Sequence, residues 1–173
     1  MAQSGDLGRF LQRLEKGRDH IRASGLKEAV ILHHDEADGL TSAALAKLAL
    51  ERLSINTSLI CLDKLYPDVV AGVEHDPGKI IVYCDIGSGH IDWLTRHNLG
   101  KNLILTLDHH DTTESNDPLV HNLNPELDGF SGETDASSAT VAYFFGKTVD
   151  LELQRFSHLA LIGSSRYPVS HAG

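Results

Sequence analysis

Three segments of this 173-residue chain place aspartate, glutamate and histidine directly after an apolar run. They read VILHHDEADG at residues 30–39, IIVYCDIGSG at 80–89 and LILTLDHHD at 103–111. Carboxylate and imidazole groups together suit Mn²⁺, Mg²⁺, Fe²⁺ or Zn²⁺. One such segment alone could be a solvated loop or a helix cap, but three favour a metal site. The candidate ligands are His34, Glu36, Asp38, Asp85, Asp108, His109 and His110.

Apolar strands that alternate with helices predict an α/β fold, with a mostly parallel sheet and helices on both faces. We expect strands at 28–34, 55–62, 79–85 and 102–108, a possible short fifth at 119–125, and helices at 6–24, 39–53, 68–74, 90–98, 136–147 and 150–163. Parallel strands put their carboxyl ends on one edge, so the three polar segments should converge there. Five or six ligands exceed the needs of one ion. They suit a pair of metals roughly 3.5–4 Å apart that clamps a phosphoryl group.

Composition narrows the class of protein. The net charge of −9 argues against a broad basic surface for duplex DNA, but it is compatible with a narrow single-strand groove or a small phosphorylated substrate. No apolar run approaches the ~20 residues of a membrane span, and the first residues lack the apolar core of a signal peptide. We therefore expect a cytoplasmic protein without membrane contact. Cys61 and Cys84 lie in apolar stretches and are expected to be buried free thiols.

Two further segments could hold a phosphate. A glycine-rich turn at 85–90 opens a helix, so N–H groups at Gly87, Ser88 and Gly89 could face an anion. The segment SGETDASSAT at 131–140 places Ser137 and Ser138 at another helix start. Ordinary N-capping explains both segments equally well, so the two interpretations stay open.

These motifs resemble those of the DHH phosphoesterase superfamily, whose name matches the triplet at residues 108–110. HDEADG resembles the first motif of that family, DIGSG the second and LDHH the third. LNPELDGFSGETDASSATVAYFF, at 123–145, is similar to the RecJ-like branch, particularly the archaeal-type single-strand nucleases. The likeness spans about residues 28–163. We expect an N-terminal amphipathic helix at 1–27, an irregular tail at 164–173, and no counterpart of the family's C-terminal substrate-binding domain.

The resemblance implies a Rossmann-like sheet, two divalent cations (Mn²⁺ foremost, Mg²⁺ as the alternative) and hydrolysis of phosphodiester bonds in single-stranded DNA or short oligonucleotides. It implies metal ligands at His34, Glu36, Asp38, Asp85 and His109. Asp85 would bridge the two metals, and His110 would contact the scissile phosphate. Asp108 would be a ligand or would orient the histidines. Asp85, His109 and His110 would form the catalytic group. The implied partners are single-stranded nucleic acid or a nucleotide, and replication or repair proteins.

The chain departs from the family pattern at two places. Glu36 stands where the first motif, D-x-D-G, has aspartate. The fourth motif ends in aspartate after a helix, whereas LALIG at 159–163 is followed by serines and no Asp occurs after Asp150. Two alternatives therefore accompany the nuclease hypothesis. One is an attenuated or non-catalytic scaffold that binds replication proteins. The other is a small-substrate phosphatase acting on pyrophosphate or a cyclic dinucleotide.

Overall fold

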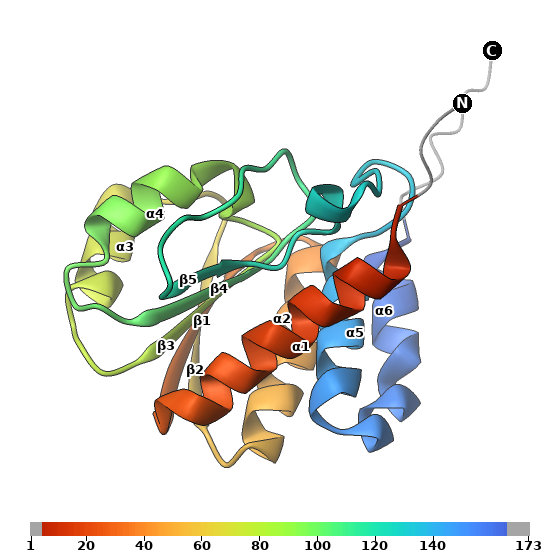
Figure 1. The fold of residues 1–173 in the computed structure, drawn as a ribbon, viewed down its shortest axis with the longest axis horizontal. Helices are drawn as coiled ribbons and strands as arrows, with labels where there is room; N and C mark the ends of the chain where they lie inside the picture. Colours follow the sequence, from red (N-terminus) through yellow and green to blue (C-terminus); the bar gives the residue numbers. More distant parts are fainter. Residues whose placement is uncertain (1–4, 166–173) are drawn as a thin grey trace.

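The computed structural model describes residues 5–165, which form one five-stranded sheet in the order β2-β1-β3-β4-β5 (Figure 1). The strands are β1 (Glu28–His34), β2 (Asn56–Leu62), β3 (Ile80–Cys84), β4 (Leu103–Leu107) and β5 (Val120–Asn122). Every pair of neighbouring strands is parallel, so all five carboxyl ends lie on one edge. The predicted fold class is confirmed, including the short fifth strand.

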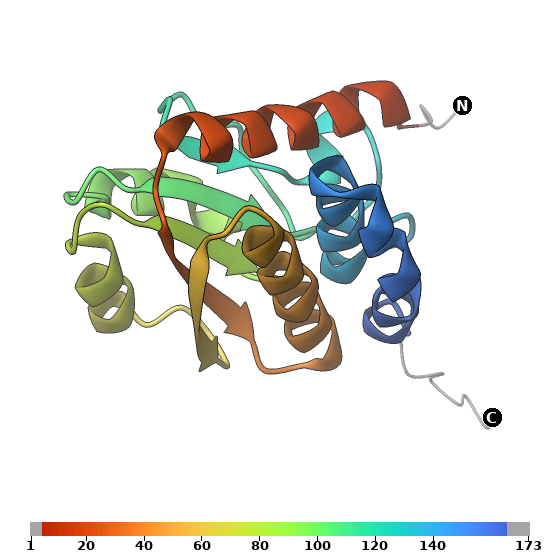
Figure 2. The same ribbon diagram turned by 90° about the horizontal axis from the view of Figure 1, so that it is seen from below.

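Helices cover both faces of the sheet (Figures 1 and 2). On one face α1 (Leu7–Ser24), α2 (Ala37–Arg52) and α5 (Ser138–Val149) pack on the strands, and α6 (Ser157–Gly163) packs on α2 and α5. On the other face lie α3 (Pro67–Glu74) and α4 (Ile91–His97). Short 3-10 turns, η1 (Ser88–His90), η2 (Pro125–Asp128) and η3 (Leu151–Phe156), connect these elements.

The apolar runs of the central strands follow from this layering. Side chains alternate along a strand, so Ile31 and Leu105 enter the core beneath α1, α2 and α5, whereas Leu32 and Ile104 enter the core beneath α3 and α4. Both faces of β3 and β4 are buried. A strand buried on both sides reads as continuously apolar, which is why these segments could be recognised in the sequence.

Helix α1 lies within one residue of the predicted range 6–24 and is shorter than the segment 1–27 assigned to it, of which residues 1–4 lie outside the described part. The carboxylate of Asp6 accepts a hydrogen bond from the amide of Arg9, and Gly25 ends the helix in the left-handed conformation. Its apolar stripe, including Phe10 and Leu14, is buried in the same core as β4. In the described part of the chain, no helix is long and apolar enough to cross a membrane.

Two expectations were wrong in detail. Residues 150–163 form η3 followed by α6 rather than one helix, because Asp150 caps a tight turn in which the Leu153 amide bonds to the Asp150 carbonyl. Cys61 is exposed, because β2 is an edge strand with most of its side chains uncovered, whereas Cys84 is buried as expected. Both thiols are free. Of the expected tail at 164–173, only 164 and 165 lie within the described residues.

Candidate metal centre

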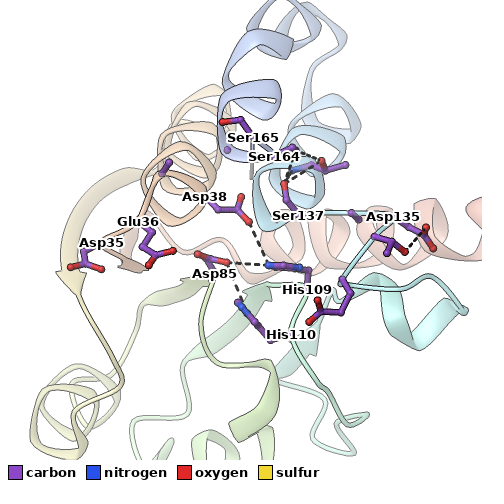
Figure 3. A pocket seen from close by; sticks show the side chains of 16 residues that line it. Asp35, Glu36, Asp38, Asp85, His109, His110, Asp135, Ser137, Ser164 and Ser165 are labelled. Atoms are coloured by element: carbon purple, nitrogen blue, oxygen red, sulfur yellow. Dashed lines mark hydrogen bonds and ion pairs between the residues drawn. The ribbon is translucent and has the colours of Figure 1, made fainter. Parts of the chain in front are cut away.

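The carboxyl edge of the sheet brings the three polar segments together. His34 ends β1, Asp38 lies in the first turn of α2, and Asp85 directly follows β3. Asp85 has a φ of 63°, in the left-handed region that non-glycine residues seldom adopt. Strain of this kind costs roughly 1–3 kcal/mol and clusters at functional sites. Here it accompanies a carboxylate that points into a cavity (Figure 3).

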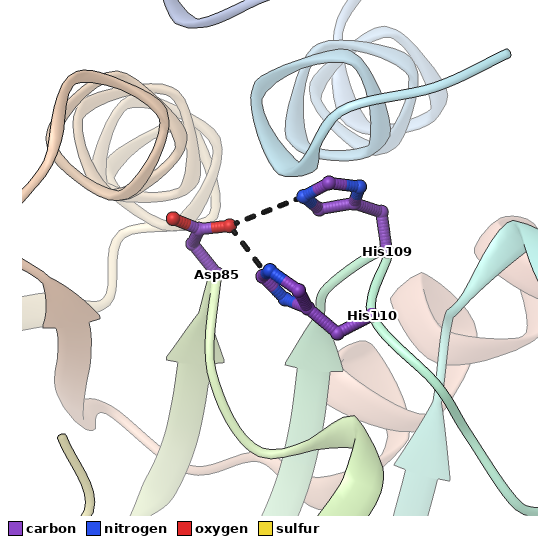
Figure 4. Close-up of side chains that lie close together, drawn as sticks. All are labelled: Asp85, His109 and His110. Carbon is purple, nitrogen blue, oxygen red and sulfur yellow. Dashed lines mark ion pairs between the residues drawn. The ribbon is translucent and has the colours of Figure 1, made fainter. Parts of the chain in front are cut away.

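The His109 ring lies between two of these carboxylates. Its Nε2 is 3.5 Å from Asp38 Oδ2 and 3.5 Å from Asp85 Oδ1. His34 Nδ1 approaches the other oxygen of Asp85 at 3.7 Å, and His110 Nδ1 lies 4.0 Å from Asp85 Oδ1. These distances are long for hydrogen bonds, so the carboxylate oxygens and the imidazole nitrogens face one another across a gap. Asp85, His109 and His110 each offer a ligand atom within 4.8 Å of the others (Figure 4).

The electrostatics of this group fit a cation. Burial, and then the charge of Asp85, raise the pKa of Asp38. Burial alone would lower the pKa of His109, but the nearby Asp85 carboxylate, the hydrogen bond to the Gly132 carbonyl and the charges of Asp38 and Asp108 raise it to about 9. In the metal-free protein a proton on His109 therefore balances the carboxylates. A divalent cation would relieve the same repulsion, and the imidazole and carboxylate donors are of the type that Mn²⁺ or Mg²⁺ accepts.

Asp108 is buried, and protein donors already occupy both of its oxygens. Its Oδ1 accepts from the His109 amide and from His110 Nδ1, each at 2.7 Å, and its Oδ2 accepts from the Ser88 amide at 2.9 Å. Burial is the largest single influence and would raise the pKa of Asp108, but the hydrogen bond and charge of His110, together with the backbone amides of Ser88 and His110, outweigh it and lower the pKa. Of the two roles left open for Asp108, this geometry favours orienting the histidines.

The phosphate candidates at the two helix starts, apart from Gly87, divide into two pairs. Ser88 and Ser138 are fully buried and engaged: the Ser88 hydroxyl donates to Asn122, and the Ser138 hydroxyl donates to Asp85 at 2.9 Å. Gly89 and Ser137, in contrast, line cavities. Gly87 is buried but lines the same cavity as Gly89. Of the two interpretations left open, the contacts of Ser88 and Ser138 favour a structural role over a phosphate contact.

Helix α5 shows why Ser138 could mislead. The amides of Ser138 and Ala139 donate to the two oxygens of Asp38, at 3.0 and 2.6 Å. The N-terminus of α5 therefore binds an anion, as its sequence suggests, but that anion is a side chain of the protein. Ser137 caps the helix by accepting from the Thr140 amide.

Two cavities meet at the centre. The first, of about 690 Å³, is lined by Asp38, Asp85, His109 and His110 together with the starts of α2 and α5 and the end of α6 (Figure 3). The second, of about 500 Å³, shares Asp85, His109 and His110 and extends past Lys64. Glu36 is exposed and lines both. Among residues 5–165, Lys64 is the one lysine or arginine that lines either cavity.

The segment that corresponds to the approach to the fourth motif also reaches the first cavity. Gly163, Ser164 and Ser165 line it, and the Ser164 hydroxyl lies 2.8 Å from that of Ser137. Hydroxyl groups therefore stand at this wall where the family pattern has a carboxylate. Asn124 and Gly132 contact the backbone of His110 and the ring of His109; their segment stands out in the sequence, but no role for either residue could be predicted from it.

Comparisons with known proteins bear on the fold and on the family of this chain. A related protein from Methanocaldococcus jannaschii, described as an uncharacterized protein, is 28% identical over 145 residues, which is 80% of this chain and 33% of that protein. The fold matches a crystal structure of exonuclease RecJ bound to manganese (TM-score 0.68, 16% identity, 94% of this chain and 43% of that one). It also matches RecJ in complex with Mn²⁺ from Thermus thermophilus (TM-score 0.66, 18% identity, 94% of this chain and 24% of that one).

The chain spans about a third of the length of the curated relative and less than half of either RecJ chain. At these identities the two solved structures establish the fold. The family is established by the sequence itself, because the pattern described as DHH family, N-terminal domain, matches residues 28–163 and so contains every strand and the whole candidate centre. The chain therefore belongs to the DHH family and carries its N-terminal domain.

Proposed function

We propose that this chain is the catalytic domain of a metal-dependent phosphoesterase. Its activity would be that of a RecJ-like exonuclease, which hydrolyses phosphodiester bonds in single-stranded DNA or short oligonucleotides. The observation that carries the proposal is the meeting of Asp38, Asp85 and His109, from the segments that follow β1, β3 and β4, around one gap. Family membership and the manganese in the two RecJ structures support it.

Two divalent cations, Mn²⁺ foremost and Mg²⁺ as the alternative, would occupy this centre. Their ligands would be His34, Glu36, Asp38, Asp85 and His109, with Asp85 shared between the two. When bound, such ions polarise phosphoryl oxygens and lower the pKa of the attacking water. Asp108 would act by holding the ring of His110 and the backbone amide of His109, since its side chain is almost fully buried and its Oδ1 already accepts from both histidines.

His110 would bind the scissile phosphate. Its ring is half exposed at the cavity, and its Nδ1–H is held by Asp108. The hydrogen bond and the negative charge of Asp108 raise the pKa of His110, which favours the positively charged ring. A fixed positive group at this position would stabilise negative charge that develops on the phosphoryl oxygens.

The charges around the centre bear on the substrate. Acidic side chains dominate the cavity walls, and Lys64 is the one lysine or arginine among the described lining residues. Binding of the phosphate groups of a substrate would therefore depend on the cations, on the histidines and on Lys64. A duplex needs a broad basic surface, whereas a single strand or a short oligonucleotide needs only a few contacts. The proposed substrate is accordingly single-stranded.

The first test is a calorimetric titration of the purified chain with Mn²⁺, followed by hydrolysis assays. We expect two tight sites and Mn²⁺-dependent cleavage of oligothymidylate. Asp85→Ala should abolish cleavage while the fold, followed by circular dichroism, is retained. Asp92→Ala, which removes an exposed carboxylate on α4, serves as the control and should leave cleavage unchanged.

Other outcomes separate the alternatives. Faster cleavage of pyrophosphate or a cyclic dinucleotide than of oligothymidylate would replace the nuclease with a small-substrate phosphatase. A folded chain with no tight site and no cleavage would leave the scaffold hypothesis. Full cleavage by Asp85→Ala would refute the proposed centre.

A further inference from the structure

The segment from Asn124 to Gly132 wraps around both histidines of the centre. Asn124 is fully buried, and its side-chain amide donates to the His110 carbonyl at 2.7 Å. Its Oδ1 accepts from the amide of Glu126 at 2.8 Å, which starts the η2 turn. This segment is therefore anchored to the histidine pair at its first residue.

The far end of the segment contacts the other ring. The Gly132 carbonyl accepts a hydrogen bond from His109 Nδ1 at 2.6 Å. A carbonyl can only accept, so this nitrogen carries the proton. The opposite nitrogen, Nε2, is then directed at Asp38 and Asp85 (Figure 3). The position of one carbonyl thus decides which nitrogen of His109 faces the gap.

Gly132 is placed by close packing and by one carboxylate. A side chain at Gly132 would overlap the backbone oxygen of His109, so only glycine permits this approach. The Gly132 amide donates to Glu126 Oε1 at 3.2 Å. Glu126 therefore ties the two ends of the segment together. A second tie, from the Ser131 amide to Asp135 at 2.8 Å, holds the neighbouring residue.

We propose that Glu126 is a positioning residue that fixes Gly132, and through it the ring of His109, for binding a divalent cation. The proposal rests on the proposed metal role of His109, but the ring orientation itself does not. Partners that orient a ligating histidine typically contribute about 10- to 100-fold to metal affinity. Because the Ser131 tie remains, we expect the lower end of that range when Glu126 is truncated.

The test compares three substitutions of Glu126 in the full chain. Glu126→Ala removes the acceptor, Glu126→Asp withdraws it by one methylene, and Glu126→Gln keeps an oxygen in place. Asp111→Ala is the matched control. Asp111 is exposed and, like Glu126, lines the second cavity, so its removal changes the local charge alone. Two quantities are measured: the exchange rate of the His109 Nδ1–H proton by NMR in metal-free protein, and the affinity for Mn²⁺ by calorimetry.

We expect the proton of His109 to exchange roughly fivefold faster in Glu126→Ala and Mn²⁺ to bind about tenfold more weakly. Glu126→Gln and Asp111→Ala should match the wild type in both. If Glu126→Ala fails to fold, Glu126→Asp decides in the same way. The proposal would be overturned if the His109 proton exchanged at the wild-type rate in Glu126→Ala or Glu126→Asp. It would also be overturned if Asp111→Ala lost as much affinity for Mn²⁺ as Glu126→Ala. If the wild type binds no Mn²⁺, the proposed function fails, while the exchange rates still decide the role of Glu126.

Discussion

Glu74 is a buried carboxylate outside the metal centre, and it makes a sharp prediction about stability. It is the last residue of α3 and is fully buried. Its Oε1 accepts from the Tyr83 hydroxyl at 2.8 Å, whereas its Oε2 has no hydrogen-bond partner within the described residues. Burial raises the pKa of Glu74 from 4.5 to about 7, against the opposing effects of the Tyr83 hydrogen bond and the charge of His97.

Because the pKa of Glu74 is raised in the folded chain, the stability of the fold should fall as pH rises. The folded chain holds the Glu74 proton more tightly than the unfolded chain, so folding is favoured while the group is protonated. As pH rises from about 4.5 through about 7, the unfolded chain releases the proton first and the folded chain loses stability. One pKa unit corresponds to about 1.4 kcal/mol, so the total loss is about 3 kcal/mol.

Glu74→Gln keeps an oxygen for Tyr83 and cannot ionise. Urea unfolding should give a stability difference between variant and wild type of less than ~1 kcal/mol at pH 5 and about 3 kcal/mol in favour of the variant at pH 8.5. Glu152→Gln, at an exposed position, is the control and should show no such trend. Parallel pH profiles for wild type and Glu74→Gln would refute the reasoning, because they would mean that Glu74 ionises equally well in both states.

Three further predictions concern the centre. Affinity for Mn²⁺ should rise up to about tenfold per pH unit between pH 6.5 and 8.5, because His109, with a pKa of about 9, must lose a proton to bind. Calorimetry that shows no dependence of this affinity on pH would exclude His109 as a ligand. Lys64→Gln should raise KM for a dinucleotide several-fold with little change in kcat, yet leave bis-p-nitrophenyl phosphate, which has a single phosphate, unaffected; equal effects on both would remove Lys64 from substrate binding. Ser138→Ala should weaken Mn²⁺ binding by about fivefold, because Asp85 loses a hydrogen bond worth ~1 kcal/mol, and unchanged affinity would show that Asp85 is held without it.

The sequence was sufficient for the parts of the centre that depend on local pattern. Apolar strands that end in Asp85 or in Asp108 and His109 can be recognised along the chain, and parallel pairing then requires their ends to meet. The identity of the anion at a helix start could not be predicted in this way. A free N-terminus and one filled by a distant carboxylate have the same local sequence, and Asp38 lies 100 residues from Ser138.

The positions of segments that are distant in the sequence also explain the other differences between the prediction and the structure. Cys61 follows the same apolar pattern as a buried strand, and only the strand order, which puts β2 at the edge, exposes it. Asn124 and Gly132 lie 14 and 23 residues beyond the histidines that they contact. Their roles depend on backbone positions that no spacing rule connects.

The family match begins at residue 28, just after α1, yet α1 belongs to the core. Phe10, Leu14 and Ile21 are buried with the side chains of β4, and each such side chain contributes roughly 1.5–3 kcal/mol. Together they match much of the net stability of a typical domain, which is about 5–15 kcal/mol. Arg13 of α1 also pairs with Asp128, inside the segment that holds His109. The unit that folds therefore extends beyond the residues that the family pattern describes, and changes in α1 can alter the centre without touching any of its motifs.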